Sequence, residues 1–317
     1  MTRLIPLTIV KFVPKLVGKC VAKLAARSAT LAATLLTVFG LTAAVSLPVH
    51  ASSGGVPLDR FPTEKLNDQA ALQNGAKLFV NHCLNCHGAA LMRYNRLTDI
   101  GLTEEQIRQN LLFTTDKVGE PMKTALSAAD AKAWFGAQPP DLSVIARARA
   151  SEQGSGPDWL YSYLRNYYRD STRATGWNNA VFPNVGMPHV FWDLQGSRGA
   201  RFEEIKAVRD DKGAQSGFVK VTVNFDEKGI RTETSEDLAH GEHPHEGTTV
   251  TLGKPVGGKL AVADYDNAIA DLVAYLTFMA DPSAKTRTRL GVWVLLFLAI
   301  FTVIAWRLNA AYWKDIK

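Results

Sequence analysis

Cysteine is scarce in this sequence. Of the 317 residues only three are cysteines, at positions 20, 83 and 86. If Cys20 leaves with an N-terminal segment and the other two hold a prosthetic group, no structural disulfide is available. A structural zinc site needs four Cys or His ligands at suitable spacing, and no second cysteine pair accompanies Cys83 and Cys86.

Acidic residues are missing from the start of the chain. No Asp or Glu precedes Asp59, whereas six Lys and Arg lie within the first 27 residues. An apolar run over 29–47 follows, and Val49-His50-Ala51 resembles a small-x-small cleavage site. Residues 1–51 are therefore predicted to be a secretory signal peptide, with an uncleaved N-terminal anchor as the alternative. Either one exports the domain that follows.

Charge is also absent from a second apolar run near the end, Leu290–Trp306. Its 17 residues reach the lower limit for a membrane-spanning helix. A buried core helix is the alternative, but such a helix rarely lacks every polar face. We expect a basic flank at 285–289, a transmembrane anchor at 290–307 and a cytoplasmic tail at 308–317. The predicted interfacial aromatics are Trp293, Trp306, Tyr312 and Trp313.

The exported part, residues 52–284, is mildly acidic although the whole chain carries a net charge of +6. Once the two basic ends are set aside, 24 basic and 29 acidic residues remain. This balance argues against a nucleic-acid partner and fits a basic protein partner, although ordinary solubility charge explains it equally well. Basic residues flank both ends of the C-terminal run, so the export signal, not the positive-inside rule, places this domain in the periplasm.

The run Cys83-Leu84-Asn85-Cys86-His87 has the C-x-x-C-H spacing at which haem is attached through two thioethers. Two cysteines on one turn reach both vinyl groups of one porphyrin, and the adjacent histidine supplies one axial nitrogen. A thioredoxin-like redox pair does not need His87. The motif predicts one covalently attached haem c with its iron.

The other axial ligand is predicted to be Met187. It lies in a stiff loop between Gly186 and Pro188, and a thioether ligand favours electron transfer. His189 is the rival, and it would give a haem of lower potential. The remaining candidates, which we rank lower, are Met92, Met122, Met279 and a surface-placed His82.

The exported domain is predicted to be mainly α-helical with a small inserted β-ribbon. The last helix, over 264–280, is expected to pack against the helix that precedes the haem motif. Aromatic residues crowd 157–168 and suit either a wall around a flat apolar ligand or an ordinary core. His240, His243 and His245 fall in a loop read as solvated rather than metal-binding. A loop followed by a helix is expected over 63–82, with Asn67 or Asp68 as the cap, and a Thr103–Gln106 capping box is expected at the start of the next helix. The other expected helices are 103–113, 125–134, 145–149, 157–168 and 264–280, and the expected strands are 219–225, 230–234, 248–252 and 260–262.

Taken together, the sequence resembles bacterial members of the cytochrome c1 family, the haem subunits of ubiquinol–cytochrome c reductase (the bc1 complex). The likeness covers nearly all of the exported part and the anchor. It is carried by the haem motif with Met92–Leu97, by Gly136–Ser143 continuing through Arg147–Arg149, by Met187-Pro188 with Trp192–Gly196, and by a helix ending near Asp281-Pro282 before one anchor.

The resemblance implies a cytochrome c-like haem domain and a one-electron relay from the Rieske iron–sulfur protein to cytochrome c. Cytochrome b, the lipid bilayer and a dimeric complex are the other implied partners, and no substrate chemistry is expected of this chain by itself. Gly88 stands where the family commonly has serine. By the same resemblance Cys83 and Cys86 bind haem, His87 and Met187 are axial ligands, and Arg149, Trp159 (in place of a usual tyrosine) and Pro140 lie near the haem.

Two other functions are compatible with parts of the sequence. A membrane-anchored cytochrome c could serve a terminal oxidase or a dehydrogenase, although the segments at 139–143 and 192–196 argue against this. A haem enzyme or gas sensor would keep an exchangeable sixth ligand and would bind carbon monoxide without treatment.

Overall fold

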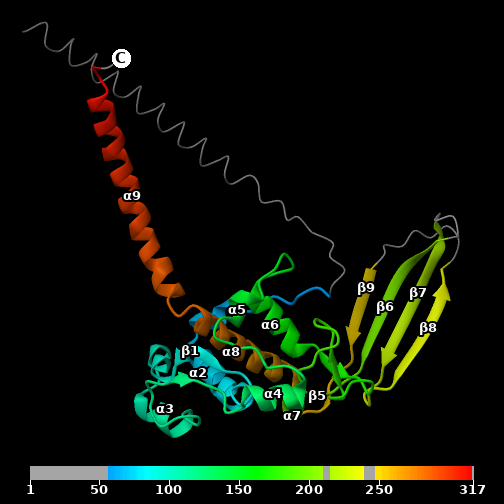
Figure 1. Cartoon of the computed structure of the whole chain (residues 1–317). Coiled ribbons are helices and arrows are strands. Elements are labelled where there is room, and N and C mark those ends of the chain that lie inside the picture. The colour runs from blue at the N-terminus through cyan, green and yellow to red at the C-terminus, as the bar shows by residue number, and fades with distance from the viewer. Residues whose placement is uncertain (1–55, 210–214, 239–246, 316–317) are drawn as a thin grey trace, which may run out of the picture. The chain divides into compact units, whose positions relative to one another are not determined.

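The computed structural model of the chain describes residues 56–209, 215–238 and 247–315. Helices make up most of the part around the haem motif, and a separate antiparallel sheet follows it in the sequence (Figure 1). The predicted export segment 1–51 and the histidines at 240, 243 and 245 lie outside the described residues.

The haem motif follows directly from a helix. A 3-10 turn, Thr63–Asn67, precedes α2 (Gln69–Leu78), and a π-helical turn, Phe79–Cys83, continues it into the motif. Asp68 caps α2 by accepting hydrogen bonds from the backbone N–H groups of Ala70 at 2.9 Å and Ala71 at 3.3 Å, as predicted.

Helix α8 (Val262–Ala280) packs against α2, and the two lie side by side in Figure 1. The crossing is close at Gly75, where an added Cβ would lie 2.1 Å from the carbonyl oxygen of Asp271. The Asp271 carboxylate accepts from Lys65 at 2.8 Å and from Asn74 at 2.9 Å. The predicted pairing is confirmed, and its buried α8 residues include Ile269, Leu272, Val273 and Leu276.

The shorter helices mostly match the predicted segments, and the Thr103–Gln106 capping box is present. The helix predicted over 157–168 is too long, however. It ends at Arg165, and Tyr167 and Tyr168 belong to a strand instead, because the chain turns at Asn166 and pairs with residues 177–179. The remaining helices are short: α3 (Glu104–Asn110), α4 (Ala128–Phe135), α5 (Ile145–Ala148), α6 (Gly156–Arg165), α7 (Trp192–Gln195) and the 3-10 helix Tyr94–Ile100. Three pairs of short strands accompany them: β1 (Ala89–Arg93) with β2 (Pro121–Met122), β3 (Tyr167–Arg169) with β4 (Trp177–Asn179), and β5 (Gly196–Ser197) with β10 (Val256–Gly257).

The predicted β-ribbon is a four-stranded antiparallel sheet with strand order β8-β7-β6-β9. Its central strand β6 was not predicted, and the strand expected over 260–262 is wrong because Val262 already begins α8. The turn between β7 and β8 is confirmed, with Gly229 at φ +85° and the Asp226 carboxylate accepting from the N–H of Lys228 at 2.9 Å. The strands are β6 (Ala200–Arg209), β7 (Gln215–Phe225), β8 (Arg231–Asp237) and β9 (Gly247–Leu252).

Helix α9 spans Ala284–Tyr312 and has no buried residue. Its most apolar window has a mean hydropathy of 2.2, and among the described residues it alone is long and apolar enough to cross a membrane. The expected basic flank at 285–289 is the first part of this same helix. Arg287 forms an ion pair with Asp281 at 2.7 Å, just after the end of α8.

Candidate haem site

The five residues of the C-x-x-C-H motif form a single tight turn. The backbone N–H groups of Cys86 and His87 both donate to the carbonyl of Cys83, at 3.1 and 2.8 Å. Both thiols are free; Cys83 is buried and Cys86 is half-buried. Burial raises the pKa of the Cys83 thiol to about 12, so this thiol is neutral at physiological pH.

The imidazole of His87 is oriented by a main-chain oxygen. Its Nδ1 lies 2.8 Å from the carbonyl oxygen of Pro140. A carbonyl can only accept, so Nδ1 carries the proton and Nε2 is left with a free lone pair, which is the form of histidine that binds a metal. Burial lowers the pKa of His87, which also favours the neutral ring.

The segment around Pro140 is held to the residues that follow the motif. The N–H of Ala90 donates to the Asp141 carboxylate at 2.8 Å, and the N–H of Leu142 donates to the carbonyl of Gly88 at 2.8 Å. Ser143 accepts from the N–H of Leu91 at 3.0 Å. These bonds keep the Pro140 carbonyl at a fixed position relative to His87.

Met187 is surrounded by two tyrosine hydroxyls. The Tyr163 hydroxyl lies 3.4 Å from Sδ, and the Tyr167 hydroxyl lies 3.2 Å from the backbone carbonyl oxygen of Met187, so each is within hydrogen-bond distance of an acceptor on this residue. The two hydroxyl oxygens lie 2.7 Å apart. Burial raises the pKa of both hydroxyls, so both are protonated at neutral pH. The sulfur is therefore held in one place by polar contacts as well as by packing.

Met122, ranked below Met187, is fully buried, and its Sδ accepts from the hydroxyl of Tyr275 at 3.5 Å. It pairs with Ala89, two residues after His87, so it lies on the strand next to the residues that follow the motif. Met92 and Met279 are buried in the same core. Of these four methionines, Met187 is half-buried and the other three are buried.

His189, the rival ligand, is buried between aromatic rings. It stacks on Tyr167 with centroids 4.7 Å apart and meets the edge of Trp177 at 4.9 Å. Burial lowers its pKa to about 3, so it is a neutral imidazole, and its Nε2 has no hydrogen-bond partner among the described residues. The choice between Met187 and His189 therefore stays a prediction.

His82 is half-buried, contrary to the surface position that the sequence suggested. Its ring lies 4.9 Å from that of Phe191, so the segment after Met187 packs against the start of the haem motif. Burial lowers the pKa of His82, and the Asp193 charge partly offsets this.

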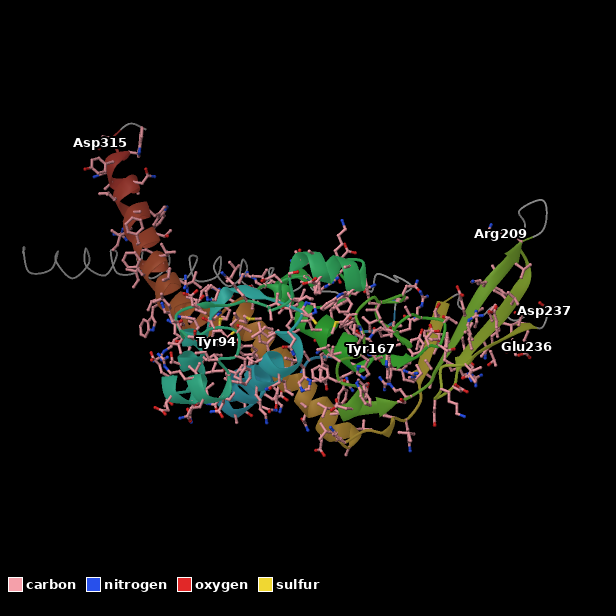
Figure 2. All side chains as sticks on the ribbon, turned by 60° about the horizontal axis from the view of Figure 1, so that its bottom comes forward. Tyr94, Tyr167, Arg209, Glu236, Asp237 and Asp315 are labelled. Atoms are coloured by element: carbon pink, nitrogen blue, oxygen red, sulfur yellow. The ribbon has the colours of Figure 1, made fainter. Side chains whose placement is uncertain are left out.

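Arg149 and Trp159 lie together, as the predicted pair requires. The guanidinium carbon of Arg149 is 4.4 Å from the centroid of the Trp159 ring, and this ring stacks on Tyr163 at 4.8 Å. A continuous column thus runs from Arg149 through Trp159 and Tyr163 to Met187. The sequence pattern indicated aromatic crowding at 157–168 but gave no separate role to Tyr163 or to Tyr167. Figure 2 labels Tyr167 in its central part.

These donors fit a covalently bound haem. Two free thiols and an imidazole with a free Nε2 share one turn, which matches thioether attachment plus one axial nitrogen. The Met187 sulfur packs against the same hydrophobic core that contains Cys83. The structure thus gathers the seven predicted site residues into two groups, Cys83, Cys86 and His87 with Pro140, and Arg149 and Trp159 with Met187, and their roles toward the haem stay predictions.

The Cytochrome C1 family model matches residues 61–197, a stretch that contains every predicted site residue. Cytochrome c1 of Allochromatium vinosum is 37% identical over 283 residues, which cover 89% of this chain and 98% of that protein. The chain belongs to the cytochrome c1 family. Cytochrome c1 of Rhodospirillum rubrum is 26% identical over 89% of this chain and 97% of its own length. A Nitrosomonas europaea protein named ammonia monooxygenase gamma subunit is 38% identical over 88% of this chain and 97% of its own length.

Family membership decides the cofactor and the general role. A cytochrome c1 carries a covalently bound c-type haem with its iron and is the haem electron-transfer subunit of a bc1 complex anchored in a membrane. Service to a terminal oxidase or a dehydrogenase is not favoured.

Proposed function

We propose that this chain passes single electrons from a Rieske iron–sulfur protein to a cytochrome c on the periplasmic side of the inner membrane. Haem attaches at Cys83 and Cys86, with His87 and Met187 as axial ligands. The observation that carries the ligand assignment is the bond from His87 Nδ1 to the Pro140 carbonyl, which leaves Nε2 available.

The haem supplies the electron-accepting centre, and the residues of the chain set its reduction potential and its access to water and external ligands. A thioether opposite an imidazole favours electron transfer over ligand exchange, and burial in a largely apolar core limits water access. Arg149 offers a positive charge beside Trp159, at the position where a haem carboxylate is expected. No residue of this chain needs to donate a proton or attack a substrate.

The proposed partners follow from the same assignment. Helix α9 would span the bilayer once, beside cytochrome b. The tail that follows α9 would then lie in the cytoplasm. The mildly acidic domain suits a basic cytochrome c as acceptor. The complex is proposed to be dimeric, as in the family that the sequence resembles.

The complex purified from native membranes tests this function. A c-type spectrum that travels with b-type haems, a Rieske protein and antimycin-sensitive quinol oxidation is expected. Co-purification with a monooxygenase instead, as the name of the Nitrosomonas relative suggests for that protein, would contradict the proposal.

The ligand assignment has its own test. Met187→Leu is expected to abolish the sulfur-to-iron charge-transfer band, to let reduced haem bind carbon monoxide and to slow electron transfer at least tenfold, because the sixth position opens. His189→Leu is the matched change at the rival position and should keep the band. A wild-type protein without this band, in which His189→Leu and not Met187→Leu opens the reduced haem to carbon monoxide, would assign the ligand to His189.

A further inference from the structure

We propose that Tyr163 and Tyr167 set the reduction potential of the haem through the direction of the hydrogen-bond chain that their hydroxyls share at Met187. The inference rests on the proposed role of Met187 as an axial ligand. It assigns a positioning role to two side chains that do not touch the iron.

The two hydroxyls make more hydrogen-bond contacts than they have protons to donate. Three contacts connect them: Tyr163 to Sδ of Met187 at 3.4 Å, Tyr163 to Tyr167 at 2.7 Å, and Tyr167 to the Met187 carbonyl at 3.2 Å. Each phenol carries one proton, and a thioether or a carbonyl can only accept. Two protons can therefore satisfy only two of the three contacts at one time.

The short contact between the oxygens decides which arrangements are allowed. At 2.7 Å the two oxygens repel each other unless a proton lies between them. Two directions remain. In one, Tyr167 donates to Tyr163 and Tyr163 donates to the sulfur; in the other, Tyr163 donates to Tyr167 and Tyr167 donates to the Met187 carbonyl.

The direction changes the electrostatic surroundings of the sulfur. A hydroxyl proton directed at Sδ draws electron density from the thioether and adds positive potential beside the metal, which disfavours the ferric state. With the chain turned toward the carbonyl, an oxygen lone pair faces the sulfur instead. The sulfur-directed chain therefore raises the potential, and the carbonyl-directed chain lowers it.

Packing prevents the hydroxyls from leaving these positions. The ring of Tyr163 stacks on Trp159 with an interplanar angle of 12°, and the ring of Tyr167 stacks on His189 with an angle of 9°. The two tyrosines are 7% and 1% exposed. Because the rings are held by stacking, replacement by phenylalanine removes a hydroxyl and leaves the packing in place.

Three single variants of the intact complex test the proposal by redox titration. Tyr163→Phe removes the donor to sulfur and is expected to lower the equilibrium constant for haem reduction by about three- to tenfold, where tenfold corresponds to about 59 mV for one electron. Tyr167→Phe leaves Tyr163 with the sulfur as its acceptor, so the constant should stay at the wild-type value or rise. Tyr161→Phe lies on the same helix, away from Met187, and serves as the control.

The outcomes separate this inference from the proposed function. Absence of the sulfur-to-iron charge-transfer band in the wild type would overturn Met187 ligation and the inference with it. With the band present, an unchanged potential in Tyr163→Phe would overturn the inference alone. Equal decreases in Tyr163→Phe and Tyr167→Phe would show a loss of packing and also overturn it.

If these variants fail to assemble, a measurement on the wild-type complex still tests the proposal. Redox-difference infrared spectra with ring-labelled tyrosine should show a shift of a tyrosine C–O band between the ferric and ferrous states, because the electron density on the sulfur that accepts the Tyr163 hydrogen bond changes with the charge of the iron. A spectrum without any tyrosine band would overturn the inference.

Discussion

Asp170 shows how one buried carboxylate stabilises the turn between β3 and β4. Its Oδ1 accepts from the N–H and the hydroxyl of Thr172, at 3.0 and 2.6 Å, and its Oδ2 accepts from Asn178 at 2.9 Å. Burial by itself would raise the pKa of Asp170, but the bonds from Thr172 and Asn178 outweigh it and lower the pKa.

The pH dependence of Asp170 follows from that sign. A lowered pKa in the folded state means that the stabilisation is fully present above the unfolded value near 3.8 and is lost as the pH falls through the folded value. Asp170→Asn should reduce the unfolding free energy by about 1–3 kcal/mol at pH 7 and weaken its dependence on pH below 4. Thermal denaturation across pH 2–7 measures this, with the exposed Asp116→Asn as control. An equal loss in both variants would contradict the assignment.

The single residues that could be predicted are those with fixed spacing or a distinctive neighbourhood. Cys83, Cys86 and His87 follow from their register, and Met187 follows from the prolines and glycine around it. Tyr163 and Tyr167 could not be predicted, because their hydroxyl partner is 20 or more residues away and their own relation is not helical: α6 ends at Arg165. The same limit applies to the Pro140 carbonyl, which no side-chain pattern marks.

At the level of elements, the helices with a clear apolar period were found and the strand β6 was not. Its residues 200–209 carry charges on both faces, including the adjacent Glu203 and Glu204, so they lack the alternation that marks a strand. The strand exists because β7 and β9 pair with it on either side, placing Phe202 opposite Val223 and Val250. Charged side chains gather at the far end of this sheet, where Figure 2 labels Arg209, Glu236 and Asp237.

The crossing of α2 and α8 gives a prediction at this scale. Gly75→Ala should reduce the unfolding free energy by about 1–3 kcal/mol, because the new methyl group meets the main chain at Asp271 and the helices must separate. Since α2 leads into the motif, haem incorporation should fall as well. Chemical denaturation and the haem-to-protein ratio measure the two effects. Gly119→Ala is the control, since nothing lies within 4 Å of an added Cβ there, and a Gly75→Ala protein as stable as this control would refute the close-crossing argument.

For the whole molecule, α9 is a helix without buried contacts, joined to the haem domain after Asp281. A chain ended after Ser283 should leave the membrane and keep its c-type haem. It loses the Arg287–Asp281 ion pair, and because the Arg287 side chain is 62% exposed, solvent screening keeps the contribution of this pair to stability small.

Fractionation of cells that produce the shortened chain gives the measurement. Recovery in the periplasmic fraction is expected if residues 1–51 are cleaved. Retention in membranes after an alkaline wash would show that the N-terminal segment remains as a second anchor, which distinguishes the two interpretations of that segment.

The bond from His87 to Pro140 has a consequence for how the site tolerates change. Its acceptor is a peptide oxygen, and every amino acid at position 140 would supply that same atom. A substitution at position 140 therefore weakens this hydrogen bond only if it displaces the backbone. The orientation of the imidazole therefore depends on the backbone at position 140, and the neighbouring side chains that matter for it are those that hold this backbone, Asp141 and Ser143.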